Sequence, residues 1–195
     1  MQGLEDESSF SCSIYNSIDP EDESILQQLG DRLRVDFDFK LTDKILGNNN
    51  KVVVFDDYIA GLISPNSIVA LLIEEKKVIG FSFAIPIGKF DPKREDESGT
   101  TAYIYLTSIA PEKRGQKLVG PLVDFLFQEL KRRGYQYVER DCLIENGYAD
   151  IIRNHYNKYD CIVKSYRHNK FPEIGPEEFF RINIASYLPN RFPNQ

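Results

Sequence analysis

A tight, basic turn precedes an amphipathic helix in the middle of the chain, in the sequence SIAPEKRGQKLVGPLVDFLFQEL. Pro121 lacks a backbone N–H, so it is tolerated only in the first turn of a helix and places the start of this helix near Leu118. The N–H groups of residues 116–120 then have no carbonyl partner and point along the positive end of the helix dipole. Arg114 and Lys117 add positive charge beside them. This combination predicts a site for an anion such as a phosphate or pyrophosphate.

The charge of the chain is acidic overall but unevenly distributed. The formal net charge is −6, and residues 1–57 hold thirteen Asp or Glu against five Lys or Arg. Residues 109–140 reverse this balance, with seven Lys or Arg against four Asp or Glu. Because broad nucleic-acid binding depends on cations that neutralise phosphates, the net charge argues against a nucleic-acid partner. The basic segment is a candidate anion site, and the acidic remainder suits an amine substrate.

The segments around the basic turn predict alternating strands and helices. Two β-rich apolar runs flank the charged tetrapeptide EEKK and indicate an antiparallel hairpin within residues 67–87. The polar, Gly- and Pro-containing stretch that follows predicts a mobile loop at about residues 87–99. The other expected strands are 10–18, 101–110, 135–144, 161–168 and 177–185; the expected helices are 19–37, 118–134 and 145–159, with a short helix and irregular structure in 41–63.

The order of these elements predicts an α/β (α+β) fold with a mixed, mostly antiparallel sheet and helices on both faces. The chain has 195 residues, of which 42% are apolar, which is enough to bury one substantial core. We therefore expect a single domain over residues 1–195, with its core at about residues 11–185.

The segment SIAPEKRGQKLVGPLVDFLFQELKRRGYQYV, followed by ENGYADIIRNHY, resembles motif A and the next elements of the GCN5-related N-acetyltransferase (GNAT) superfamily. The motif runs Gln/Arg-x-x-Gly-x-Gly/Ala. Arg114 matches its first position, whereas Lys117 and Val119 replace the two small residues that let the family's backbone approach the pyrophosphate of coenzyme A. In element order the resemblance covers residues 11–185. It implies a GNAT-like acyl-CoA N-acyltransferase fold and acetyl-CoA as co-substrate.

The resemblance also implies where acetyl-CoA binds. The pantetheine arm would pair its amides with the backbone of the strand that ends at Ile109, where the fourth and fifth strands separate, so that these polar groups stay satisfied. Asn146, followed three residues later by Ala149, matches a pair that is frequent in the family. The implied CoA-binding residues are Ile109, Arg114, Gly115, Gln116, Lys117, Leu118, Val119, Gly120 and Asn146.

The family uses a tyrosine hydroxyl to protonate the departing CoA thiolate, and the resemblance assigns this role to Tyr156. Tyr156 lies seven residues after Ala149, close to two helical turns, so it projects from a similar face of the helix. Tyr148 is the alternative proton donor. The alternative for Tyr156 is a purely structural role, as a core tyrosine whose hydroxyl is satisfied.

The group that accepts the amine proton is less evident. Some relatives carry a glutamate on the fourth strand, where this chain has Tyr103, with Tyr105 on the same strand face. These tyrosines would hold a water molecule that relays the proton, although strand aromatics are more often packing residues; Glu145 is a less favoured base. The two histidines, His155 and His168, are expected at the surface without a role.

The resemblance thus implies an N-acetyltransferase that moves an acetyl group from acetyl-CoA to a primary amine, on a small molecule or a protein, by direct transfer in a ternary complex. The main alternative is a non-catalytic module of the same fold that binds acyl-CoA or a protein partner. An unrelated βαβ nucleotide-binding domain is disfavoured because the chain lacks Gly-x-Gly-x-x-Gly and is rich in hairpin signals. The oligomeric state stays open between monomer and homodimer.

Three unrelated cysteines and only two histidines support neither a disulfide framework nor a metal site. The acidic N-terminal segment MQGLEDESS differs from the basic start of a signal peptide, and no apolar run approaches the length of a membrane span. We therefore expect a reduced, cytoplasmic protein without a membrane partner.

Overall fold

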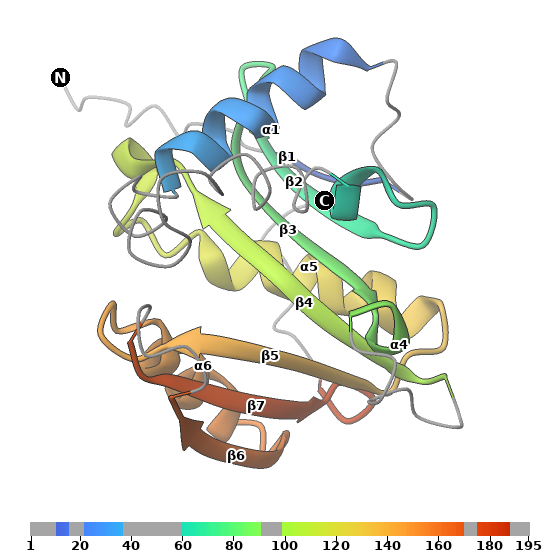
Figure 1. The fold of residues 1–195 in the computed structure, drawn as a ribbon, viewed down its shortest axis with the longest axis vertical. Coiled ribbons are helices and arrows are strands. Elements are labelled where there is room, and N and C mark those ends of the chain that lie inside the picture. Colours follow the sequence, from blue (N-terminus) through green and yellow to red (C-terminus); the bar gives the residue numbers. More distant parts are fainter. Residues whose placement is uncertain (1–10, 16–21, 37–59, 91–98, 170–174, 188–195) are drawn as a thin grey trace, which may run out of the picture.

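The computed structural model describes residues 11–15, 22–36, 60–90, 99–169 and 175–187. Seven strands form one mixed sheet in the order β1-β2-β3-β4-β5-β7-β6 (Figure 1). The predicted mixed, mostly antiparallel sheet is confirmed, since among the described strands only β4 and β5 pair in parallel. The strands are β1 Ser11–Tyr15, β2 Ile68–Glu74, β3 Lys77–Pro86, β4 Thr101–Ile109, β5 Tyr137–Leu143, β6 Ile162–His168 and β7 Glu177–Asn183.

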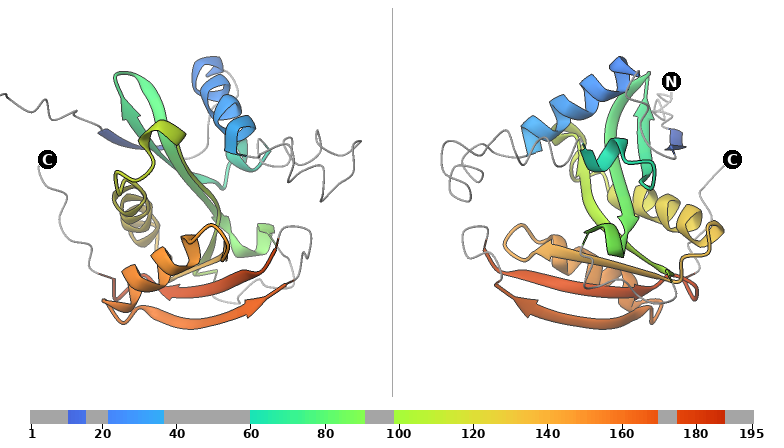
Figure 2. Two further views of the ribbon diagram at one scale, coloured as in Figure 1. Left: turned by 90° about the vertical axis from the view of Figure 1, so that its left-hand side faces the viewer. Right: turned by 45° about the vertical axis from the view of Figure 1, so that its right-hand side comes forward.

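Helices cover both faces of this sheet, as predicted (Figure 2). Helix α1, Glu23–Asp36, packs on one face, where Leu29 joins a cluster with Phe81 and Phe83 of β3. Helices α5, Val119–Arg132, and α6, Tyr148–Asn157, contribute to the larger core on the opposite face. Because β4, α5, β5 and α6 share this core, the position of the β4–α5 turn relative to β5 is fixed.

The predicted hairpin forms from β2 and β3, which pair antiparallel. Glu75 and Lys76 occupy its two-residue turn with left-handed φ values of 47° and 67°. Such a turn matches the right-handed twist of the two strands. Gly80 of β3 lies so close to the end of β4 that an added Cβ would come within 2.6 Å of the Ile109 side chain, so the glycine permits this packing.

Helix α1 begins one turn later than the Asp-Pro pair suggested. Asp22 caps it, because its Oδ1 accepts a hydrogen bond from the N–H of Ile25 at 3.2 Å. An Asp side chain at this position satisfies one of the donors that a helix start leaves unpaired. The beginning of the expected segment, up to residue 21, lies outside the described residues.

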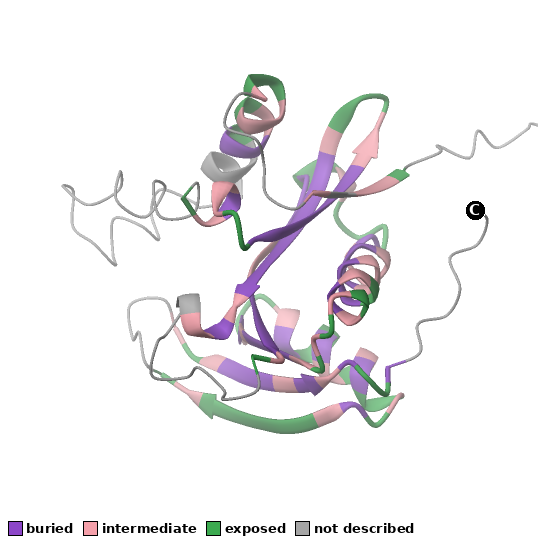
Figure 3. Cartoon of the chain, turned by 90° about the vertical axis from the view of Figure 1, so that its right-hand side faces the viewer, coloured by how far each residue is buried: buried purple, intermediate pink, exposed green. Residues whose placement is uncertain are grey.

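The C-terminal hairpin is arranged differently from its order in the chain. Strand β7 pairs with β5 along its whole length and separates β5 from β6, which becomes the edge of the sheet. The residues of β6 from Val163 to Arg167 are exposed, whereas β2, β3 and much of β4 are buried (Figure 3). The sequence predicted two closing strands but not which of them is internal.

Strands β4 and β5 pair over three residues only, from Thr101 with Tyr137 to Tyr103 with Glu139, and then diverge. The register of β4 against β3 changes at the same place, because Phe83 pairs with Leu106 and Ala84 with Ile104, which leaves Tyr105 as an extra residue. Such a bulge bends its strand and increases the local twist. The bulge at Tyr105 therefore accounts for the divergence of β4 from β5.

The loop predicted at residues 87–99 begins as a short helix, α4, over Ile87–Phe90. Residues 91–98 lie outside the described part of the chain, as do residues 41–59 of the segment expected to be a short helix and irregular structure. Across the described ranges, no helix has the length and apolar composition needed to cross a bilayer.

Candidate functional site

The turn from β4 to α5 presents a row of unpaired backbone donors. Helix α5 begins at Val119, one residue from the predicted start, and Leu118 precedes it without a side-chain cap. Within the described residues, no carbonyl accepts a hydrogen bond from the N–H groups of residues 116–120. Since the same N–H groups carry the positive end of the helix dipole, the predicted anion-binding geometry is present.

Lys117 adopts the backbone conformation of a glycine. Its φ is 61°, and Gly115, two residues earlier, has a φ of 81°. A left-handed conformation costs a residue with a Cβ on the order of 1 kcal/mol relative to glycine. The turn thus keeps the shape that a glycine would give it at the first small position of the motif, although a lysine occupies that position.

The cations of the turn are used in different ways. Lys113 pairs with Glu74 of the β2–β3 hairpin at 2.5 Å, so its charge is partly neutralised. The Nε of Arg114 donates to the carbonyl oxygen of Ile109 at 3.1 Å and thereby ties the turn to the end of β4. The exposed Lys117 ammonium forms no ion pair with the described residues, which leaves it available to an anion at the free N–H groups.

A cavity of about 880 Å³ opens where β4 and β5 diverge and extends to the free N–H groups of the turn. Leu106, which packs with the α1-side cluster, contributes to its wall together with residues of α5 and α6. On β4 the cavity is lined by Leu106 to Ile109, and the predicted Tyr103 and Tyr105 are not among its lining residues. Its other lining residues are Thr107, Ser108, Ile109, Lys113, Arg114, Gly115, Lys117, Leu118, Val119, Gly120, Val123, Leu143, Asn146, Tyr148, Ile151, Ile152, His155 and Tyr156.

Eight of the nine residues expected to bind CoA line this cavity, and Gln116 is the exception. Asn146 is also engaged locally, because its Oδ1 accepts a hydrogen bond from the N–H of Tyr148 at 2.9 Å. This interaction stabilises the first turn of α6 in the manner of an Asx turn. Gln116 is exposed on the turn, where its backbone N–H belongs to the row of free donors.

Tyr156 lies in the wall of the cavity, as a proton donor to the thiolate would need to. Only 1% of its surface is exposed, and its ring stacks on Phe127 with centroids 5.3 Å apart. Burial raises the pKa of Tyr156 well above 10, and the carboxylate of Asp124 raises it further. The phenol is therefore protonated at neutral pH, which a general acid requires.

Asp124 belongs to a small polar cluster behind Tyr156. The hydroxyl of Tyr187 donates to Asp124 Oδ1 at 2.6 Å and lies 2.9 Å from Nε2 of His155. Burial, followed by its bond to Asp124, raises the pKa of Tyr187 above the ordinary value. His155 lines the cavity with a side chain that is 32% exposed, so it is not the solvated surface residue expected from the sequence.

The rival proton donor, Tyr148, also lines the cavity. Its hydroxyl is enclosed and lacks a hydrogen bond of ordinary geometry, although Thr107 and Arg140 lie near it. The Arg140 guanidinium lies 4.7 Å from the centroid of its ring. Burial raises the pKa of Tyr148, and the neighbouring guanidinium acts in the opposite direction.

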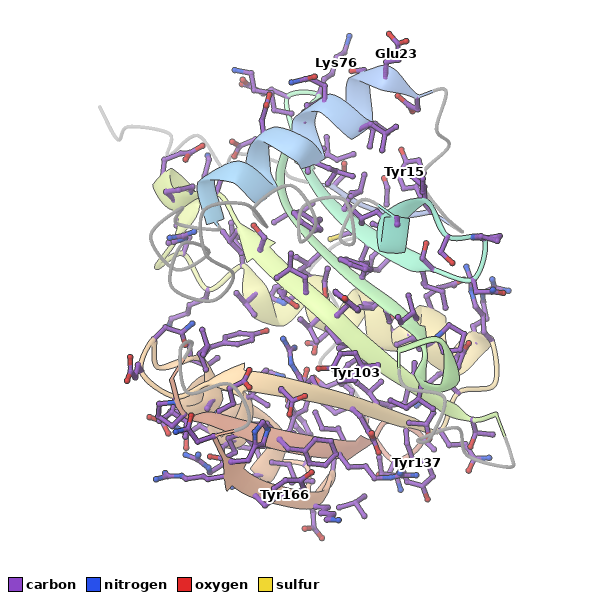
Figure 4. All side chains as sticks on the ribbon, viewed as in Figure 1. Tyr15, Glu23, Lys76, Tyr103, Tyr137 and Tyr166 are labelled. Carbon is purple, nitrogen blue, oxygen red and sulfur yellow. The ribbon has the colours of Figure 1, made fainter. Side chains whose placement is uncertain are left out.

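The opposite face of the gap carries a second hydrogen-bonded group. The hydroxyl of Tyr103 donates to Asp141 Oδ2 at 2.8 Å, and Nε2 of His168 lies 2.9 Å from Asp141 Oδ1. Tyr105 packs edge-on against Tyr103 with ring centroids 6.2 Å apart. Figure 4 shows Tyr103 and Tyr137 towards the end where β4 and β5 meet, and Tyr166 on the outer strand β6.

His168 was expected at the surface without a role, and the structure places it partly buried between two carboxylates. Its side chain is 21% exposed, and Asp141 and Glu177 flank it at 2.9 and 4.0 Å. The cause is the strand order, because His168 of β6 reaches Asp141 of β5 across the intervening strand β7. Glu145, the less favoured base, is exposed and lies near Gly175 rather than in the cavity wall.

Sequence reasoning missed Arg140 and Asp141, which are adjacent in β5 and face opposite sides of the sheet. The sequence YVERDCL of β5 contained a signal for Arg140, because alternate residues of a strand point to the same face of the sheet. Val138 and Cys142 point into the helical core, so the residue between them on that face is a buried arginine. A charged residue at an inward strand position is uncommon and marks a site that needs explanation.

The remaining titratable groups give no metal site and no disulfide. Among the described residues, no three His, Cys, Asp or Glu side chains are placed to hold a metal ion. The three cysteines, Cys12, Cys142 and Cys161, are free thiols.

This fold occurs in solved acetyltransferase structures. An aminoglycoside 6'-N-acetyltransferase in complex with coenzyme A matches with a TM-score of 0.59 and 16% identity over 91% of this chain and 98% of its own. A protein from Salmonella typhimurium, solved with acetyl-CoA as its cofactor, matches with a TM-score of 0.61 and 15% identity. The match covers 95% of this chain and 99% of that protein. An N-acetyltransferase from Staphylococcus aureus Mu50 matches with a TM-score of 0.59 and 14% identity; the match covers 89% of this chain and 99% of that protein.

The chain thus has the acyl-CoA N-acyltransferase fold of the GNAT proteins, and the resemblance drawn from its motif is confirmed at the level of the fold. At 12–17% identity the likeness does not extend to a particular activity. No protein-family model matches the sequence, and no curated protein matches it.

Proposed function

We propose that the protein is an N-acetyltransferase that transfers the acetyl group of acetyl-CoA to a primary amine by direct attack in a ternary complex. The observation that carries this proposal is the continuity of the cavity, which joins the free N–H groups at the start of α5 to the gap between β4 and β5. An elongated ligand with an anionic end and a peptide-like arm fits this arrangement. The solved neighbours that contain coenzyme A or acetyl-CoA support the choice of ligand.

The chain's own groups would bind the ligand in the following way. The free N–H groups of residues 116–120 and the Lys117 ammonium hold the pyrophosphate. The edge of β4 beyond Tyr103 no longer pairs with β5, so its backbone near Ile109 is placed to pair with the pantetheine amides. A backbone N–H in the same stretch, such as that of Ile109, stabilises the oxyanion that forms when the amine attacks the thioester.

Proton transfer would occur on both sides of the gap. Tyr156 donates its proton to the departing thiolate from the helical side. Tyr103 and Tyr105 hold a water that takes the amine proton on the opposite side, where Tyr103 is anchored to Asp141. The amine acceptor is a small molecule or a protein side chain, and the acidic net charge of −6 favours a cationic one.

A second function is favoured by one specific observation. Lys117 and Val119 occupy the positions of the motif's two small residues, and their bulk would hinder close contact between backbone and pyrophosphate. A non-catalytic module that binds acyl-CoA, or that binds a protein, would tolerate such a change. Neither alternative needs the proton donors in the cavity wall.

Ligand-induced stabilisation and turnover separate these functions. We expect acetyl-CoA and CoA, but not ATP, to raise the melting temperature of the full chain, because a ligand that binds only the folded state stabilises it. Release of CoA thiol with a panel of polyamines, aminoglycosides and lysine peptides then identifies an enzyme. Binding without thiol release would favour the acyl-CoA-binding module, and absence of both would overturn the proposal.

A further inference from the structure

The core beneath the cavity contains a charged arginine without a counter-ion. Arg140 lies in the middle of β5 on the face of α5 and α6, and 3% of its surface is exposed. No carboxylate in the described part of the chain forms an ion pair with it. Arginine stays protonated in proteins, so the positive charge is retained in an environment that solvates it poorly.

The hydrogen bonds of the guanidinium do not compensate for this burial. Its Nη2 reaches Thr107 Oγ1 at a long 3.4 Å, while Nε and Nη1 make no hydrogen bond of ordinary geometry, although the thiol of Cys142 lies near the guanidinium. Thr107 itself is shared with Ser82, whose Oγ lies 2.8 Å from Thr107 Oγ1. Since well-packed apolar side chains are often more stable than buried ions, an unpaired cation retained here calls for a reason other than stability.

The position of the guanidinium supplies that reason. The two groups that cover it, Thr107 of β4 and the ring of Tyr148 in α6, both line the cavity. Leu143 of the same strand and Tyr156 of α6 line it as well. The charge therefore lies directly behind the wall of the space where, on the proposed function, the thioester would react.

We infer that Arg140 is a positioning residue whose fixed charge stabilises the negative charge formed when the thioester is cleaved, an inference that rests on the proposed acetyl transfer. The amine nitrogen forms a bond to the carbonyl carbon and gives up a proton to the water held by Tyr103 and Tyr105, while the C–S bond breaks with its electron pair on sulfur. The sulfur takes the proton of the Tyr156 hydroxyl, and the phenolate regains a proton from solvent. Arg140 lowers the energy of both anions, the thiolate and the phenolate, through its field in a poorly screened environment.

The charged and titratable groups around Tyr156 make such a cation necessary. Asp124 of α5 disfavours a phenolate by its negative charge, while Tyr187 after β7 and Tyr148 of α6 also disfavour it. His155 of α6 contacts Tyr156 edge-on, with centroids 4.8 Å apart, and is bonded to Tyr187. Arg140 is the group whose charge favours the ionised form of both Tyr156 and Tyr148.

The test uses bound CoA and needs no acceptor. The ultraviolet absorbance of the CoA thiolate is titrated against pH in complexes with the full-length protein, and the same titration with desulfo-CoA subtracts the protein's own thiols and tyrosines. We expect the bound CoA thiol to titrate about one pH unit lower in the wild type than in Arg140→Met, a tenfold difference in thiolate formation. Arg140→Gln should behave like Arg140→Met, and Arg140→Lys should lie between them and the wild type.

Arg167→Met is the matched control, because it removes a cation from the exposed edge strand β6, where the side chain is 68% exposed. It should leave the titration of bound CoA unchanged. Melting temperatures separate the electrostatic role from a structural one, since the loss of a buried unpaired charge should not lower the stability of Arg140→Met. If one neutral variant fails to fold, the other still gives the comparison.

Failure of the inference and failure of the proposed function are distinguishable. If the wild type binds CoA and transfers acetyl groups but the thiol of bound CoA titrates alike in the wild type and the neutral variants, Arg140 has no such role. If the wild type binds no CoA, the proposed function fails and the inference with it. A shift in the neutral variants that Arg167→Met does not reproduce would support the inference.

Discussion

Tyr103 and Asp141 are joined across the gap between two strands that have just stopped pairing. The Tyr103 hydroxyl donates to Asp141 Oδ2 at 2.8 Å. Tyr103 is the last residue of β4 that pairs with β5, where its partner is Glu139, and Asp141 follows two residues later on the same face of β5. Asp141 also lies within hydrogen-bond distance of His168 on the outer strand. This group lies on the face opposite the helices that line the cavity, where, on the proposed function, an amine acceptor would approach the thioester.

Loss of the Tyr103 hydroxyl should impair the acceptor half-reaction and spare CoA binding. We expect Tyr103→Phe and Asp141→Asn each to lower kcat/KM for the amine by about 10- to 100-fold, because general-base assistance contributes on this scale or above it. The Kd of acetyl-CoA, measured by calorimetry, should not change. Tyr166→Phe is the control, since Tyr166 is 46% exposed on β6; equal effects of Tyr166→Phe and Tyr103→Phe would remove the role assigned to Tyr103.

Reversal of charge at the β4–α5 turn should weaken CoA binding. The double variant Arg114→Glu, Lys117→Glu places two negative charges beside the free N–H groups, and we expect at least a tenfold rise in the Kd of CoA, or about 1.4 kcal/mol. Arg132→Glu, a reversal at the other end of α5 where the side chain is 72% exposed, should have little effect. An unchanged Kd in the double variant would place the anion site elsewhere.

The left-handed backbone of Lys117 predicts an unusual order of stabilities. Lys117→Gly relieves the strain of a φ of 61°, whereas Lys117→Ala removes the same charge but keeps a Cβ. The glycine variant should be more stable than the alanine variant by about 0.5 to 1 kcal/mol, the strain relief being partly offset by the greater flexibility of glycine in the unfolded chain. Urea unfolding measures the difference, and a more stable alanine variant would contradict the backbone conformation.

Removal of the Tyr156 hydroxyl should reduce turnover without changing the core. Tyr156→Phe keeps the stacking on Phe127. We expect kcat to fall by up to about 10²-fold, near the lower limit for general acid catalysis because a thiolate is a tolerable leaving group. Tyr148→Phe is the parallel variant, and a loss of kcat in it alone would transfer the role of proton donor to Tyr148. Melting temperature and acetyl-CoA affinity should stay unchanged in both.

The stability of α5 should depend on pH through Glu129. Its hydrogen bond from Arg132, together with that from Arg133, lowers the pKa of Glu129 to about 2 against the opposing effect of burial. A carboxyl whose pKa is lower in the folded state stabilises the protein above its unfolded pKa of roughly 4.3, and this stabilisation is lost as the pH falls from about 5 towards 2.

Glu129→Gln should therefore lower the free energy of unfolding by about 1 kcal/mol at pH 7, the magnitude expected for partly solvated ion pairs. The difference from the wild type should shrink as the pH approaches 2. Glu112→Gln, at an exposed acid in the β4–α5 turn, controls for a general effect of net charge. A difference that is the same at pH 7 and pH 3 would show that Glu129 contributes by packing rather than by charge.

The sequence by itself determined most of the elements and the row of free N–H groups at the β4–α5 turn, because both depend on residues close together in the chain. Pro121 limits the start of α5, and the apolar spacing after it defines the buried face of the helix; the charged tetrapeptide between two apolar runs specifies the β2–β3 hairpin. Local chemistry also indicated that Tyr103 and Tyr105 share a strand face, and the two rings are in contact.

Only the tertiary structure decided what lies on either side of the gap between β4 and β5. Asp141 meets Tyr103 because β4 lies next to β5, and it meets His168 because β6 follows β7 at the edge of the sheet, a choice of neighbours that no local pattern encodes. Arg140 is buried because α5 and α6 pack over β5. It lacks a counter-ion because this packing brings no carboxylate of the described residues to it. Burial and strand order depend on contacts between distant segments, which is why these two residues became evident only in the folded chain.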